Sequence, residues 1–133
     1  MKRILLALII LIFCVTVFLG CTPKEFKNLN ENEIKSITVT TLPEFYGYEC
    51  RLIGDEAYEV VDYLSNLNLS PVLFEVGKGG LTWVISIEYE NENTTDVKFF
   101  DKKVSVNGTR YRMENEEAEI FEGWLVTLTQ SND

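Results

Sequence analysis

The order of apolar and polar residues divides the chain into strands and helices. Apolar and polar side chains alternate over residues 35–41, 81–90 and 94–100, and this period of two predicts half-buried strands. Residues 45–53 are rich in aromatic and apolar side chains and predict a further strand. Pro43 separates the predicted strands at residues 35–41 and 45–53, and a glycine-rich loop precedes the strand that begins at residue 81.

Two turns predict how neighbouring strands pair. Asn107-Gly108 is the strongest hairpin signal, because both central positions of a type I′ turn need a positive φ. Residues 91–93 predict a three-residue turn between the strands at 81–90 and 94–100. The predicted pairs are Val106 with Thr109 and Val104 with Tyr111 in the first hairpin, and Ile87 with Val97 and Ile85 with Phe99 on the buried side of the second.

Two segments change to the period of an amphipathic helix. Residues 55–67 and residues 116–129 each carry one apolar stripe and a first turn rich in acids. Negative side chains are stabilised there by the positive end of the helix dipole. Gly123 lies inside the second helix and suggests close packing against a strand. The two stripes are Ala57, Val60, Val61, Leu64 and Leu67, and Ala118, Phe121, Trp124, Leu125 and Leu128.

The order β-β-α-β-β-β-β-α indicates the α+β class. Two amphipathic helices and several antiparallel strands favour a two-layer domain, with both helices on one face of an antiparallel sheet. A sandwich or barrel is the alternative, and the two helices argue against it. We expect a single domain over residues 34–133.

The N-terminal segment has the pattern of a secretory signal. A basic start precedes an apolar run over residues 4–19, and Gly20-Cys21 follows. Residues 17–21 resemble the lipobox of bacterial lipoproteins. The resemblance implies that residues 1–20 are removed, that Cys21 is lipidated, and that the chain is held on the extracytoplasmic face of the cell membrane. An uncleaved signal anchor is the alternative. The layout of the remaining domain is similar to that of small uncharacterised lipoproteins of Gram-positive bacteria.

The charge of the chain limits its partners. Residues 21–133 carry 10 basic and 21 acidic side chains, a net charge of −11, because Lys2 and Arg3 lie in the signal segment. This charge argues against nucleic acid as a ligand and favours a basic protein or a surface polymer. Residues 21–33 comprise the lipidated cysteine and a polar segment that predicts a flexible tether.

The sequence offers few groups for catalysis. It contains no histidine, which excludes histidine-based triads and metal sites, and we expect neither a metal nor a cofactor. Cys50 is predicted to be a small core residue. Residues 77–80 could bind an anion but lack the rest of a phosphate loop, and residues 91–93 with Asp96 could bind calcium but lack the full loop spacing. A flexible connection and a solvated turn are the preferred interpretations.

One aromatic stretch is the best candidate for recognition. Phe45, Tyr46 and Tyr48 surround a glycine and could form an exposed binding patch, or instead pack beneath the helices. We therefore expect a membrane-tethered binding or interaction module without catalytic activity. The alternatives are a small inhibitor or immunity-type envelope lipoprotein, and a small-molecule sensor with a cavity between the helices and the sheet.

Overall fold

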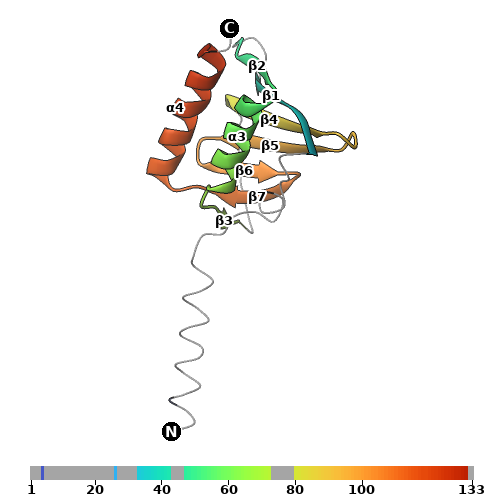
Figure 1. Cartoon of the computed structure of the whole chain (residues 1–133). Coiled ribbons are helices and arrows are strands. Elements are labelled where there is room, and N and C mark those ends of the chain that lie inside the picture. Colours follow the sequence, from blue (N-terminus) through green and yellow to red (C-terminus); the bar gives the residue numbers. More distant parts are fainter. Residues whose placement is uncertain (1–3, 5–25, 27–32, 43–46, 73–79, 132–133) are drawn as a thin grey trace.

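The computed structural model describes residues 4, 26, 33–42, 47–72 and 80–131 (Figure 1). The predicted alternation and the helical periods appear as strands and helices at the expected places. In chain order the elements are β1 (Ile34–Leu42), β2 (Glu49–Leu52), α3 (Asp55–Ser65), β3 (Ser70–Pro71), β4 (Thr82–Tyr89), β5 (Thr94–Phe100), β6 (Lys103–Val106), β7 (Thr109–Arg112) and α4 (Asn115–Ser131).

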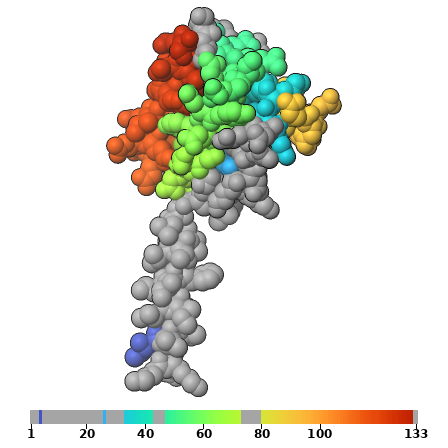
Figure 2. All heavy atoms as spheres, viewed as in Figure 1, coloured from blue at the N-terminus to red at the C-terminus, as the bar shows by residue number. Residues whose placement is uncertain are grey.

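The strands form one antiparallel sheet in the order β2-β1-β4-β5-β6-β7-β3. β2 and β3 are the two edges, and α3 connects them across the sheet. In Figure 1 α3 lies in front of the strands and α4 to their left, and the space-filling view shows α3 and α4 side by side (Figure 2). The fold is therefore the predicted α+β arrangement of one sheet and two helices.

The core lies between the helices and the facing side of the sheet. Alternate strand residues point into it, so that β4 contributes Trp83, Ile85 and Ile87 while its intervening residues face outward. The predicted stripe of α3 is buried throughout, and Leu67 is buried just beyond the helix end. In α4 the stripe is narrower than predicted, since Trp124 and Leu128 are only half-buried and Thr129 is buried.

The hairpin at Asn107-Gly108 is confirmed. Asn107 and Gly108 have φ values of 47° and 87°, as a type I′ turn requires. β6 and β7 pair in the predicted register, Val106 with Thr109 and Val104 with Tyr111. The turn is also hydrogen-bonded to the neighbouring strand β5, because the Asn107 side chain accepts a hydrogen bond from the backbone N–H of Asp96 at 2.9 Å.

The predicted register of the β4–β5 hairpin is wrong by two residues. Ile87 pairs with Thr95 and Ile85 with Val97, because the backbone N–H of Tyr89 bonds to the Asn93 carbonyl and closes the turn one residue early. Glu92 takes the positive φ of 68° that a three-residue loop needs. A shift of two preserves the alternation of faces, so the predicted buried residues of both strands remain buried.

The structure corrects two local predictions and adds one short strand. The second strand spans only residues 49–52, because Gly47 has a φ of 73° and interrupts the extended backbone. β3 was not predicted, since it has two residues and one of them is Pro71. Gly123 does not mark close packing, because a Cβ atom there would meet no atom within 4 Å.

Phe26 belongs to the core although it lies in the segment predicted to be a flexible tether. Its side chain is 1% exposed and is part of the same buried cluster as the sheet and the helices. The predicted tether is therefore not separate from the domain at Phe26. The domain therefore draws part of its core from a residue before position 34.

Candidate functional site

A hollow of about 360 Å³ lies where β1 ends and β2 begins. Its lining comes from residues 40–42 and 47–49, on either side of the connection between these strands. Tyr48, one of the three aromatic residues predicted to bind, lines this hollow. Phe45 and Tyr46 lie outside the described residues, so their part of the prediction stays a prediction.

Tyr48 is packed against the core on one side and half-exposed on the other. Its ring centroid lies 5.3 Å from that of Trp83, with an angle of 38° between the planes. Trp83 is 1% exposed. Tyr48 therefore combines the two predicted alternatives, because it contacts the edge of the core and also faces a hollow.

Within the described part of the chain, two buried polar groups in or next to this lining have no hydrogen-bond partner. They are the Thr41 hydroxyl and the Trp83 indole N–H, and the two residues are direct partners in the pairing of β1 with β4. An unpaired buried donor or acceptor costs about 1–3 kcal/mol. This pair was not predicted from the sequence. The available signal was Thr41 itself, which by alternation shares the buried face with Ile37 and Val39.

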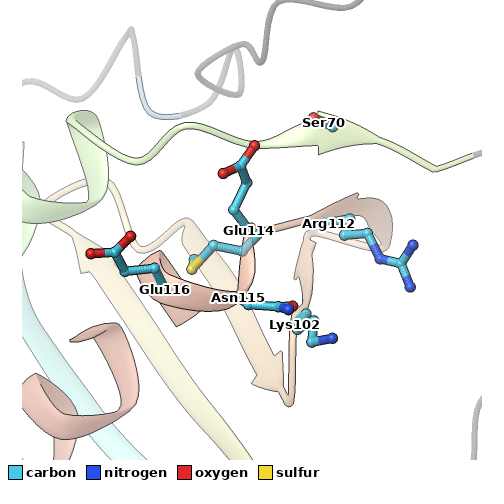
Figure 3. Close-up of a pocket in the computed structure, with 7 residues that line it drawn as sticks. Ser70, Lys102, Arg112, Glu114, Asn115 and Glu116 are labelled. Atoms are coloured by element: carbon cyan, nitrogen blue, oxygen red, sulfur yellow. The ribbon is translucent and has the colours of Figure 1, made fainter. Parts of the chain in front are cut away.

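A second hollow, of about 590 Å³, lies at the start of α4 (Figure 3). Lys102 and Arg112 extend to one side of it, while the carboxylates of Glu114 and Glu116 turn away from them. The backbone here is held by hydrogen bonds, including one from the Met113 N–H to the Lys102 carbonyl at 2.7 Å. Positive and negative groups of equal number line this hollow, so it has no net preference for an anion or a cation.

The residues weighed as calcium ligands do not converge, in line with the preferred interpretation of a solvated turn. The Asn91 side chain accepts a hydrogen bond from the Asn93 N–H at 3.1 Å, which stabilises the turn. The Asp96 carboxylate instead accepts a hydrogen bond from the Ser86 hydroxyl at 2.7 Å. Among the described residues, no group of three or more acids or cysteines is placed to hold a metal ion.

The glycine-rich candidate lies mostly outside the described residues, since only Gly80 of residues 77–80 is described. A Cβ atom on Gly80 would overlap the ring of Phe100. This close approach gives a packing reason for glycine at that position. Cys50 is a buried thiol, as predicted.

A polar network crosses β1, β2 and β4 on the outer face, which is the sheet face opposite the helices. Lys35 donates a hydrogen bond to Glu88 at 2.9 Å, and the Ser36 hydroxyl donates to the same carboxylate at 3.2 Å. Arg51 donates to the Ser36 hydroxyl at 3.4 Å. The hydrogen bond with Lys35 lowers the pKa of Glu88, and the same contact raises the pKa of Lys35. Both side chains are at the surface, so the network fixes local geometry more than it adds stability.

Charge is divided between the two faces of the domain. Each helix carries four acidic residues and no lysine or arginine, and nearly all of these carboxylates are exposed. Glu117 is the partly buried exception, and it accepts a hydrogen bond from the backbone N–H of Asn68 at 3.0 Å. The outer face at the β5–β7 end instead carries the basic residues Lys98, Lys103, Arg110 and Arg112.

No helix in the described part of the chain is long and apolar enough to cross a membrane. Compared with protein-family models, with curated proteins and with solved structures, the chain matches none of them.

Proposed function

We propose that this protein is a binding or interaction module without catalytic activity, held on the extracytoplasmic face of the membrane by lipid on Cys21. The lipobox-like segment at residues 17–21 supports the anchor. Two acyl chains on one cysteine hold a protein stably on a bilayer, whereas a single chain does so only marginally. The net charge of −11 on residues 21–133 keeps the domain away from anionic lipid head groups.

The observation that carries the binding role is the acidic helical surface, formed by the exposed carboxylates of α3 and α4. They are Asp55, Glu56, Glu59 and Asp62 on α3, and Glu116, Glu119 and Glu122 on α4. Because neither helix contains a basic residue, these charges are not neutralised within the helices. Such a field steers a basic partner toward this face and raises its association rate.

The partner that fits this surface is a protein or surface polymer with a basic patch. An inhibitor or immunity-type lipoprotein is one form of this role, since it also acts by binding a protein. A small-molecule sensor is the second candidate, and the hollow beside Tyr48 is the observation that favours it.

The test compares two charge reversals that change the net charge equally. One variant carries Glu119→Lys and Glu122→Lys on α4, and the matched control carries Glu90→Lys and Glu92→Lys at the β4–β5 turn. The immobilised full chain is exposed to envelope extract at low and high salt. We expect salt to weaken capture of a defined component, and the α4 variant to lose it while the turn variant keeps it. Equal capture by both variants would contradict the proposal.

A further inference from the structure

We infer that the hollow between the end of β1 and the start of β2 binds a small, neutral, hydroxyl-bearing molecule of the carbohydrate class. The inference goes beyond the binding of a basic partner, and it rests on the second candidate function, the small-molecule sensor, for which it names the class of ligand. It stands on the unpaired polar groups, the aromatic wall and the charge of this hollow.

The unpaired polar groups define what the ligand must supply. The Thr41 hydroxyl can donate or accept a hydrogen bond, and the Trp83 indole N–H, which lies next to the described lining residues and not among them, is a donor only. Thr41 lines the hollow, and Trp83 contacts both Thr41, through strand pairing, and Tyr48, through its ring. Hydroxyl and amide groups of a sugar offer both donors and acceptors within the span of one molecule.

The wall also includes one aromatic and one aliphatic side chain. Tyr48 presents a half-exposed ring that is backed by Trp83, and Leu42 is 43% exposed at the rim. A pyranose has an apolar face of C–H groups that packs on such a ring, while its edge carries hydroxyl groups. An aromatic ring beside polar groups therefore offers both kinds of contact that a sugar makes.

Charge and size narrow the ligand further. Glu49 is the charged residue among the described lining residues, and no lysine or arginine is among them. An anionic ligand would therefore meet a carboxylate and no cation in this part of the wall. The volume of about 360 Å³ is near the lower end of the range for small-molecule sites, which suits a molecule of one or two sugar rings.

The test follows Trp83 directly in the full chain, solubilised in detergent. Trp124→Phe leaves Trp83 as the single tryptophan, because the chain has two. N-acetylglucosamine and glucose are titrated while the Trp83 emission and its indole N–H resonance are recorded, with inorganic phosphate as the anionic comparison. We expect a saturable change with at least one sugar, a downfield shift of the indole resonance, and no saturable change with phosphate.

Thr41→Val removes the buried hydroxyl with little change in shape, and Thr38→Val is the matched control on the outer face of the same strand. We expect Thr41→Val to weaken sugar binding about tenfold or more while it raises the thermal midpoint, since an unpaired group is removed. Thr38→Val should leave binding unchanged. Tyr48→Phe should retain binding and Tyr48→Ala should lose it.

Three results would overturn the inference. The first is the absence of a saturable response to either sugar in the chain with native Thr41 and Tyr48, and this result alone is sufficient. The second is equal binding by Thr41→Val and Thr38→Val. The third is an indole resonance that is already downfield and does not respond to sugar, which would mean that a bound water satisfies the two groups.

Discussion

Tyr63 of α3 and Trp124 of α4 stack face to face, with ring centroids 4.1 Å apart and ring planes within 6° of parallel. Phe121 lies beside both rings and meets Phe99 of β5 edge-on, at a centroid distance of 4.9 Å. Aromatic pairs of this kind add about 0.5–1.5 kcal/mol each beyond the burial of their surface. This series of rings therefore fixes the two helices to each other and to the sheet.

The position of Tyr63 predicts a loss of stability at alkaline pH. Burial raises the pKa of Tyr63, and the carboxylate of Glu117 raises it further. The fold thus favours the neutral phenol, and this contribution is complete below the unfolded pKa of about 10.0 and lost as the pH rises through the higher folded pKa. Tyr63→Phe keeps the stacked ring and has no proton to lose, so its stability should fall less above that pH.

Urea unfolding at neutral and alkaline pH measures the effect. Tyr58→Phe, on the same helix, is the control, because Tyr58 is outside the aromatic series. Near neutral pH we expect the Tyr63→Phe variant to remain within about 0.5 kcal/mol of the native chain. An equal alkaline loss in the Tyr63→Phe and Tyr58→Phe variants would show that Tyr63 does not cause the pH dependence.

Two glycine substitutions should change stability in opposite directions. Gly123→Ala lies in an exposed helix interior with open space around it, so we expect a gain of about 0.5–1 kcal/mol. Gly108→Ala places a side chain at a φ of +87°, and we expect a loss of about 1–2 kcal/mol. Chemical denaturation of both variants measures the difference, and the same sign for both would contradict the structure at one of these positions.

Phe26 predicts where the stable domain begins. Phe26→Ala removes a ring that is 1% exposed and should cost about 3–5 kcal/mol. A fragment that begins at residue 32 should be destabilised by a similar amount relative to one that begins at residue 22. Lys24→Ala is the control within the same segment. Equal unfolding midpoints for the two fragments would show that Phe26 does not contribute to the stability of the fold.

The sequence predicted those features that depend on neighbouring residues. Alternation located the central strands, the period of α3 located its buried stripe, and Asn107-Gly108 located a hairpin with its register. Each of these follows from backbone geometry within a few residues. The predicted β4–β5 register was wrong because Glu92 takes the left-handed conformation. Glutamate rarely adopts this conformation, and position 92 has no glycine or asparagine from which it could have been predicted.

The features that join distant segments were not predictable in the same way. The stack of Tyr63 on Trp124 depends on how α3 lies against α4, and the pairing of Thr41 with Trp83 depends on a crossover between β1 and β4. Acids in the first turns of both predicted helices were evident from the sequence, but only the fold shows that basic residues lie on the outer face of β5–β7, opposite these helices.

The proposed anchor predicts the fate of Cys21. Cys21→Ser removes the thiol that would accept lipid, so we expect no incorporation of labelled palmitate and an uncut precursor. Cys14→Ser is the matched control, because Cys14 lies inside the apolar run and should leave labelling unchanged. Continued palmitate labelling of the Cys21→Ser variant would contradict a lipoprotein anchor at this residue.

The central claim, that the acidic helical surface contacts a macromolecular partner, is tested most directly by site-specific photo-crosslinking in intact cells. A photoreactive residue is placed at Glu119 or Glu122 on α4 and, for comparison, at Glu92 in the β4–β5 turn. Our account predicts a discrete crosslinked product from the α4 positions that disappears when the other acids of that helix are reversed to lysine, and no such product from position 92. The absence of any product from α4, or the same products from α4 and from the turn, would contradict it.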